Sequence, residues 1–487
     1  MSGTSKERTN DPIKIDEAKA AKLRNATKTE PTISWIFTTE DGKRQVDIPK
    51  LGKAILAEHN CVIAENRGKE DFYEYDPKLH YWVHKNIKSL RSIVNSMLDK
   101  HNVWTSKVDR DTFLFISNHI ERVNWADTFG KLLGYRFNFQ NGVWDWETME
   151  LIKHDPKYYF TSCVGYPLVI DKRYSDAKTI INDWKDKSTW LETEKWLALS
   201  LGENMQAMME FIGYIFYPSY EPMQLFVILL SPGGDGKTTF MRYTVNLIGK
   251  DNVAHVSLVD LADKNANNFN LSELSGKFLN EYDDISNSRI PDTTVLTKLT
   301  GGDDITAPVK NRPAINFNNF AKLFFAANDL PSFRNTTNGF ARRINVMPFF
   351  RINNFDKTID MVKVKEERGR FVYKCLILAR DAMKRDPVEI KQTNSIIETK
   401  NAWLKDNDPV QQFIDENCNL DENSTVSEQD LYNTYYDWCC DKGLKSLSIM
   451  RFKHELKNKN IHRKFTRLRI KGVRKRIYFY QGISLLV

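Results

Sequence analysis

A glycine-rich loop stands between an apolar run and a helical segment, and its residue types suit phosphate binding. After Met223–Leu230 the chain reads Ser231-Pro232-Gly233-Gly234-Asp235-Gly236-Lys237-Thr238-Thr239, and Phe240–Ile248 has helical character. Glycines let backbone N–H groups converge on phosphate oxygens at a helix N-terminus, where a lysine adds charge and a threonine hydroxyl reaches magnesium. The sequence therefore predicts ATP and Mg²⁺ as cofactors, bound by Pro232–Thr239 with Thr238 on the metal. The usual pattern begins with Gly, and Ser231 departs from it.

Acidic and amide side chains follow two further strand-like runs. Asp283-Asp284 end the run Gly276–Tyr282, and Asn328 ends the run Lys322–Ala327. Phosphoryl transfer to water needs a carboxylate near the metal and a group that orients the water. We expect Asp283 to hold the metal shell, Asp284 to orient or deprotonate the water, and Asn328 to position it. The alternatives are a solvated acidic turn for the aspartates and a structural turn cap for Asn328.

Two arginines, Arg342 and Arg343, stand just before the apolar run Ile344–Phe349. An arginine presented to the γ-phosphate on a neighbouring subunit accelerates phosphoryl transfer by orders of magnitude. The alternative for either arginine is a surface ion pair, which contributes little.

The positive charge is concentrated at one end of the chain. The 487 residues contain 71 Lys+Arg and 63 Asp+Glu, a net charge of +8. From Arg451 onward there are 12 Lys+Arg and one acid, a local charge of +11, so the preceding residues carry −3. Such an excess in one module indicates an anionic polymer as partner, with a solvated basic surface as the alternative. The candidate phosphate contacts there are Arg467, Arg469, Lys471, Arg474, Lys475 and Arg476.

Length and patterning predict an α/β protein of about three domains. Residues 1–50 form a polar segment, and 51–197 an α+β accessory domain with hairpins around Asp76-Pro77 and Gln140-Asn141-Gly142. The P-loop ATPase core is expected over 198–385, where continuous apolar runs indicate a buried parallel sheet. A linker with one helix occupies 386–410. Two helices and a basic hairpin over 411–487 predict a winged-helix DNA-binding domain.

Several classes of protein are disfavoured by composition. Six scattered cysteines without a C-x-x-C pair argue against a zinc site or a disulfide framework. The longest apolar run has six residues, far fewer than the roughly 20 of a membrane helix, so we expect no membrane partner and a cytoplasmic location. Asp109-Arg110-Asp111 lacks apolar strand flanks, and we discount priming chemistry there.

The segment from about Gly202 to Phe349 resembles the superfamily 3 helicases, a branch of the AAA+ ATPases, and most of all the phage, plasmid and poxvirus-type primase–helicases. Four motifs occur in that family's order: Gly233–Thr239, Asp283-Asp284, Lys298-Leu299-Thr300-Gly301-Gly302-Asp303, and Asn328 within Ala326–Pro331. Together they are much more specific than a P-loop alone.

The resemblance implies an AAA+ core that works as a ring, expected to be a hexamer. It also implies a β-hairpin, here Ile305–Val309 and Ala314–Phe317, whose tip grips single-stranded DNA through Lys310 and secondarily Arg312. One of Arg342 and Arg343 would be the finger that acts on the neighbouring subunit, and spacing favours Arg343.

The expected function is an ATP-dependent replicative DNA helicase of a phage, plasmid or other mobile element. Its expected partners are single- and double-stranded DNA, further copies of itself, and a primase or other replication proteins. Two alternatives stay open: an origin-binding initiator without processive unwinding, and a non-motor P-loop enzyme whose basic tail tethers it to DNA.

Overall fold

The computed structural model describes residues 34–66, 69–130, 133–263, 268–285, 290, 292–310, 312–333, 338–470 and 473–486. The described residues fall into two compact units. Unit 1 contains the chain up to Ile63 together with Asp71–Glu74 and Lys85–Arg122, and unit 2 contains the remainder.

Unit 1 is built on amphipathic helices that share one buried core. Leu90, Val94 and Leu98 recur at every fourth position of α3 and are fully buried with Leu51 and Ile55 of α2. The Thr105 side chain caps α4 by accepting from the Val108 backbone N–H, which sets the start of the helix. The elements up to Asn124 are β1 (Ile36–Thr38), β2 (Arg44–Val46), α2 (Ile48–Glu58), β3 (Cys61–Asn66), β4 (Lys69–Asp76), β5 (Tyr81–Lys85), α3 (Lys88–Lys100), α4 (Ser106–His119) and β6 (Glu121–Asn124).

Two hairpins predicted from turn residues are present. Strands β4 and β5 flank the Asp76-Pro77 turn in a sheet with the order β5-β4-β3-β6. In unit 2, β7 (Arg136–Phe139) pairs antiparallel with β8 (Gly142–Asp145), and β8 with β9 (Glu150–Ile152). Phe137 and Phe139 lie in the same buried core as the central sheet, so residues 123–197 group with the region of the central sheet and not with unit 1.

The central sheet has five parallel strands in the order β11-β12-β15-β10-β16. Their bounds are β10 (Phe226–Leu230), β11 (Val253–Ala254), β12 (Leu279–Tyr282), β15 (Lys322–Ala327) and β16 (Ile344–Pro348). Val227 and Leu229 of β10 belong to one buried core, and Phe226 and Ile228 to another. The continuous apolar run is explained by this burial of both faces.

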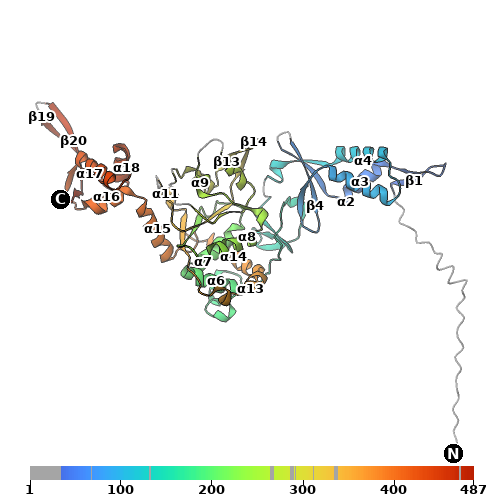
Figure 1. The fold of residues 1–487 in the computed structure, drawn as a ribbon, viewed down its shortest axis with the longest axis horizontal. Helices are drawn as coiled ribbons and strands as arrows, with labels where there is room; N and C mark the ends of the chain where they lie inside the picture. The colour runs from blue at the N-terminus through green and yellow to red at the C-terminus, as the bar shows by residue number, and fades with distance from the viewer. Residues whose placement is uncertain are drawn as a thin grey trace, which may run out of the picture. The chain divides into compact units, whose positions relative to one another are not determined.

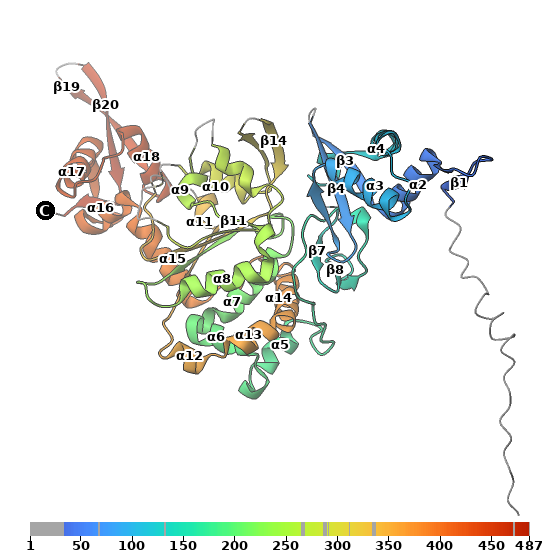
Figure 2. The ribbon, with the colours of Figure 1, turned by 45° about the vertical axis from the view of Figure 1, so that its right-hand side comes forward.

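Helices cover both faces of the sheet. The face with α7, α8 and α14 is visible below the strands in Figure 2, and α9 and α10 lie on the other side. The helices of this region are α5 (Ala177–Asp183), α6 (Glu192–Leu201), α7 (Met205–Ile215), α8 (Lys237–Ile248), α9 (Leu258–Leu261), α10 (Thr294–Leu299), α11 (Asn338–Ala341), α12 (Phe355–Thr358), α13 (Met361–Glu366), α14 (Arg368–Ala382) and α15 (Asn394–Asp406). Trp403 of α15 is buried in the second core, so the helix expected in a linker packs on the region of the central sheet.

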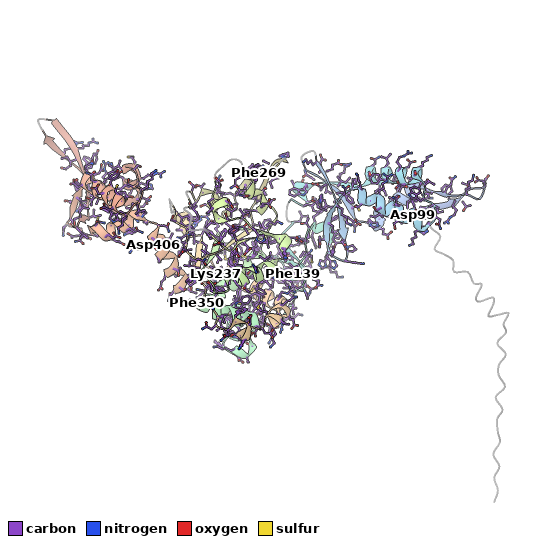
Figure 3. The ribbon with its side chains drawn as sticks, viewed as in Figure 1. Asp99, Phe139, Lys237, Phe269, Phe350 and Asp406 are labelled. Carbon is purple, nitrogen blue, oxygen red and sulfur yellow. The ribbon has the colours of Figure 1, made fainter. Side chains whose placement is uncertain are left out.

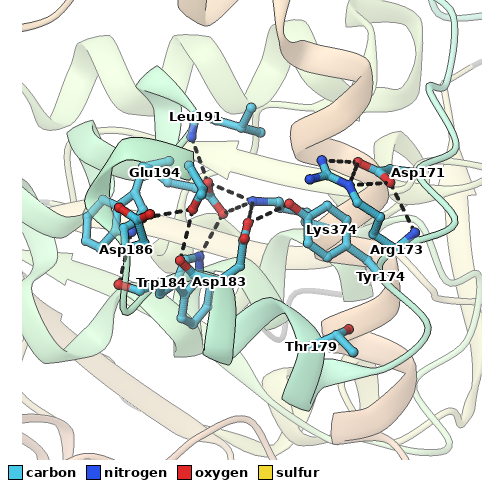
Figure 4. A network of polar contacts seen from close by, with 12 residues as sticks. Asp171, Arg173, Tyr174, Thr179, Asp183, Trp184, Asp186, Leu191, Glu194 and Lys374 are labelled. Carbon is cyan, nitrogen blue, oxygen red and sulfur yellow. Dashed lines mark hydrogen bonds and ion pairs between the residues drawn. The ribbon is translucent and has the colours of Figure 1, made fainter.

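A buried ion pair fastens α6 to α14 (Figure 4). Lys374 Nζ lies 2.9 Å from both carboxylate oxygens of Glu194, and both side chains are almost completely buried. Glu194 also accepts from Trp184 Nε1 at 2.8 Å and from the Leu191 backbone N–H at 2.8 Å. Because these donors bind both of its oxygens, their hydrogen bonds offset the cost of burying the Glu194 carboxylate away from water.

The C-terminal module has its own core, formed by Phe413, Leu431, Tyr435, Phe452 and Leu456 among others. Its elements are α16 (Pro409–Asn417), β17 (Cys418–Asn419), β18 (Thr425–Ser427), α17 (Glu428–Asp441), α18 (Ile449–Asn458), β19 (Arg463–Ile470), β20 (Val473–Gln481) and β21 (Ser484–Leu485) (Figure 1). The side chain of Ser427 caps α17, and α18 begins directly after Ser448.

Candidate functional site

The glycine-rich loop connects β10 to α8, as its sequence predicts. Gly233, Gly234 and Gly236 have φ of 112°, 67° and 97°, conformations that residues with a Cβ rarely adopt. These values let the chain turn sharply at the carboxyl end of β10. Lys237 is then the first residue of α8, and Thr238 and Thr239 are exposed in its first turn. The loop thus has the strand–turn–helix context that phosphate binding requires.

Lys237 lies near the middle of the region built on the central sheet, with its side chain only 6% exposed (Figure 3). Its Nζ donates to the Ser231 carbonyl at 2.7 Å, to Asp235 Oδ2 at 2.8 Å and to Asn328 Oδ1 at 3.2 Å. The lysine therefore joins the loop to the end of the neighbouring strand, β15. Lys237 and Asn328, which are 91 positions apart, are brought together as the sequence motifs require.

The Asp235 carboxylate occupies the middle of the loop. It accepts from the backbone N–H of Gly233 at 3.1 Å and of Lys237 at 2.9 Å, and from the Ser231 hydroxyl. Burial opposes ionisation of this carboxyl, but the Lys237 and Ser231 hydrogen bonds outweigh it and lower its pKa to about 2. The Asp235 carboxylate thus accepts hydrogen bonds from backbone N–H groups and a lysine, the kinds of donor that bind phosphate oxygens.

The acidic pair follows β12 on the same sheet edge. Strand β15 pairs with β10 on one side and with β12 on the other, all parallel, so their carboxyl ends share an edge. Asp283 and Asp284 come directly after β12 and are exposed, as is Asn328 after β15. The sequence-predicted water and metal residues therefore lie on the edge that carries the loop.

Glu281, which interrupts the apolar run of β12, is buried and has a partner that sequence reasoning missed. Its Oε2 lies 2.9 Å from His255 Nδ1, just beyond β11. Burial raises the pKa of Glu281, and the nearby Asp283 charge adds to this, while His255 opposes it. The carboxyl group of Glu281 is thus accommodated within β12 by its contact with His255, which follows the neighbouring strand β11.

The two arginines before β16 have different surroundings. Arg343 is 5% exposed, donates from Nη2 to Gln224 Oε1 at 2.7 Å, and donates from Nη1 to the Gly339 carbonyl. Arg342 is less buried, and its Nη2 donates to the same Gln224 oxygen at 3.0 Å. Spacing favoured Arg343 for contact with a neighbouring subunit, but its guanidinium is used inside its own chain. Arg342 is the more accessible of the two.

The hairpin expected ahead of β15 is present as β13 (Asp304–Val309) and β14 (Arg312–Asn318). Ile305 and Phe317 anchor its base in the core, and the register shifts between Ala307 and Val309. Lys310 follows β13 at the turn and is exposed. Arg312 pairs with Val309, so its backbone belongs to β14 and not to the tip.

The basic residues of the terminal hairpin are only partly described. Arg467 and Arg476 are exposed and stand opposite each other in the β19–β20 ladder. Arg469 and Arg474 are paired in the same ladder through their backbones, Lys475 is in β20, and Lys471 lies outside the described residues. The Phe465 and Tyr478 pair beside them was not singled out from sequence, although strand alternation already places Phe465 with Arg467.

The described ranges contain neither a cluster suited to a metal ion nor a membrane-spanning helix. No group of three or more His, Cys, Asp or Glu residues there could hold a metal ion. No helix in the same ranges combines the length and apolarity needed to cross a bilayer. Asp109, the first acid of the Asp-x-Asp sequence, is buried against Arg91, with Oδ2 and Nη2 2.7 Å apart.

Three family models match separate parts of the chain. Residues 53–198 match a model described as D5 N terminal like, 405–481 match one described as Poxvirus D5 protein-like, and 229–343 match a family of unknown function, DUF5906. The two D5 models flank the segment that contains the loop, the acidic pair and Asn328.

One curated relative and two solved structures are similar at low identity. The "Putative helicase L207/L206" of Acanthamoeba polyphaga mimivirus is 23% identical over 238 residues, which is 48% of this chain and 23% of that protein's length. An apo structure of the NrS-1 C-terminal region has 13% identity and a TM-score of 0.47, covering 89% of this chain and 98% of that one. A second structure of that region has 12% identity, a TM-score of 0.44, and coverage of 90% and 100%.

Proposed function

Because the chain belongs to the D5-type primase–helicase family, we propose that it is an ATP-dependent replicative DNA helicase of a phage, plasmid or other mobile element, moving along single-stranded DNA as a ring. Membership of this family supports a helicase-type role in DNA replication. The motor, its cofactors and its ring are our proposal. The chain spans less than a quarter of the mimivirus relative's length, so the activity of that whole protein is not assigned to this chain.

The observation that carries the proposal is the contact between Lys237 and Asn328 across β10 and β15. A P-loop strand next to a strand ending in a polar residue, with the acidic strand beyond it, is the arrangement expected of an AAA+ ATPase. The sheet order β11-β12-β15-β10-β16 supports this, because it brings all three motifs to one edge.

The residues fit ATP and Mg²⁺. Lys237 and the backbone N–H groups of the loop would bind phosphate oxygens, and Thr238 and Asp283 would hold the ion, which supplies charge neutralisation when bound. Asp284 and Asn328 would orient the attacking water. An arginine of the neighbouring subunit would complete the site, and Arg342 is the better placed for this because Arg343 is buried.

The hairpin of β13 and β14 would couple hydrolysis to movement. Its base is anchored in the core and β14 leads directly into β15, whose end carries Asn328, so these two strands would connect the nucleotide site to Lys310. In a ring, such tips from successive subunits would line the channel and contact phosphates of one strand. The C-terminal module would supply additional DNA contacts through its basic hairpin.

The test is ATP hydrolysis and strand separation by the full chain and two variants. We expect single-stranded DNA to stimulate hydrolysis, Lys237→Ala to abolish it, and Lys310→Ala to retain it while losing unwinding. Thr306→Ala, an exposed change on the same hairpin, is the matched control and should retain both. DNA-stimulated hydrolysis without strand separation by the unchanged chain would favour the initiator alternative, whereas unwinding that survives Lys310→Ala would refute the role of Lys310 in gripping the strand. A monomer without DNA stimulation would refute the motor.

A further inference from the structure

The terminal hairpin has one face that combines arginines with aromatic rings. In the β19–β20 ladder Phe465 stands opposite Tyr478, and Arg467 opposite Arg476. Because alternate residues of a strand share a face, these four side chains lie together, and we call them the wing face. Phe465 is 51% exposed, and Arg467 and Arg476 are also exposed. A large apolar ring and two cations are therefore offered to solvent on one surface.

The charges of the wing face are not balanced within the described chain. Like charges directly across a ladder destabilise it, and Arg467 and Arg476 are such a pair. Among the described side chains no carboxylate forms an ion pair with either guanidinium. Arg476 instead lies over the Phe465 ring, 5.2 Å from its centroid. An anion bound between the two arginines would remove the repulsion.

Other cations of the module are already neutralised. Lys453 Nζ of α18 lies 2.7 Å from Glu428 Oε1, and Arg463 binds the other oxygen of the same carboxylate. Lys459 pairs with Asp408. Lys453 and Lys459 thus each have an acidic partner inside the module. Arg451 and Lys457 remain exposed on α18, whereas the wing face adds the exposed Phe465 ring to its two arginines.

Duplex and single-stranded DNA differ in what they offer to such a face. Both carry phosphates for arginine, but only an unpaired strand has bases free to stack on a ring. Rings that serve only the hydrophobic core are buried, as Tyr480 is on the paired strand β20, whereas Phe465 of β19 is half exposed. Exposed rings interleaved with arginines are the composition of sites that hold single strands.

We propose that the wing face binds an unpaired nucleic-acid strand, with a base stacked on Phe465 and phosphates between Arg467 and Arg476. This deepens the proposed function, on which the identity of the strand as DNA rests. The module would then hold a strand at a junction, in place of laying α18 into the groove of a duplex as winged-helix modules commonly do.

The experiment measures binding of the full chain to a labelled oligothymidine, to the same length of duplex DNA, and to oligouridine, without nucleotide. We expect Phe465→Leu to weaken oligothymidine binding about tenfold, since stacking contributes about 1–3 kcal/mol per base, and to leave duplex binding unchanged. Phe465→Trp should restore binding and shows that folding is intact. Met450→Ala, on exposed α18, is the control and should change neither.

The arginines are tested through salt dependence. Arg467→Ala with Arg476→Ala should reduce the slope of log affinity against log salt by about 0.7 for each single-strand phosphate that is no longer neutralised. Equal losses on duplex and single strand, or no loss with Phe465→Leu, would overturn the proposal. Tighter binding of oligouridine than oligothymidine would identify the strand as RNA. These outcomes are separate from the proposed ATPase, which Lys237→Ala tests and which Phe465→Leu should leave intact without DNA.

Discussion

Asp235 places a negative charge where phosphate is expected to enter. Its carboxylate accepts from Lys237 Nζ and from two backbone N–H groups of the loop. Because its pKa is lowered to about 2, it is ionised throughout the neutral range. The stabilisation from these hydrogen bonds is present above the ordinary carboxyl pKa and disappears only as pH falls toward the lowered value. A nucleotide bound as proposed would therefore have to displace this anion.

We predict that Asp235→Asn tightens nucleotide binding several-fold. The amide has the same shape, but hydrogen bonds to an uncharged acceptor are roughly half as strong as those to a carboxylate, so the loop donors are more easily released. Titration with a fluorescent ATP analogue measures the effect, which should be constant across the neutral pH range. Asp356→Asn removes one exposed charge elsewhere and is the control. Unchanged or weaker binding would contradict the competition.

Arg342 and Arg343 differ in burial, and we predict opposite phenotypes. Arg342→Ala should abolish hydrolysis by the assembled protein while leaving its thermal stability unchanged. Arg343→Ala should lower the free energy of unfolding by about 1–3 kcal/mol, because Gln224 and Gly339 lose a buried donor. Mixing Arg342→Ala subunits with Lys237→Ala subunits should restore part of the activity, since some interfaces then combine intact halves. No recovery on mixing would argue against action between subunits.

Among the elements, α6 and α14 depend on one buried ion pair. Breaking it by removing one partner leaves an uncompensated charge away from water, which costs about 3–5 kcal/mol. We predict this loss for Lys374→Met and for Glu194→Leu, measured by chemical denaturation of the full chain. The double variant should recover only part of the stability, because the Lys374–Glu194 charges are both gone but Asp183, 3.5 Å from Lys374 Nζ, and the Trp184 and Leu191 donors lose their partners. Additive losses in the double variant would show that the two side chains act independently.

The observed boundaries of helices and strands agree with those predicted from sequence where a helix cap or a turn residue defines them. Ser427 and Gly249 mark helix ends, and Asn141-Gly142 marks a hairpin, because each acts through its own backbone conformation. Strand β10 was expected from Met223 but begins at Phe226, since Gln224 faces the two arginines instead of the ladder. Arg312 similarly joined β14 because a register shift shortened the turn. Such shifts depend on partners far along the chain.

At the scale of the molecule, the charge excess and the glycine-rich loop occupy separate modules. We predict that a chain ending at Asn407 retains DNA-independent ATP hydrolysis and loses much of the salt-sensitive DNA affinity. The cut precedes Asp408, which caps α16 and pairs with Lys459 of the removed module. Binding at several salt concentrations measures the loss, and the hydrolysis rate of the same sample is the control. Unchanged affinity would refute the DNA-binding role of the tail.

The sequence by itself determined the motifs, their order, the sheet-type runs and the position of the charge, because local spacing and composition carry that information. Only the tertiary structure decided which residues meet. It joined Lys237 to Asn328, buried Arg343 more deeply than Arg342, and neutralised Lys453 with Glu428. These outcomes depend on contacts between positions far apart in the chain, where burial and charge pairing are set by the packing of whole elements and not by neighbours in sequence.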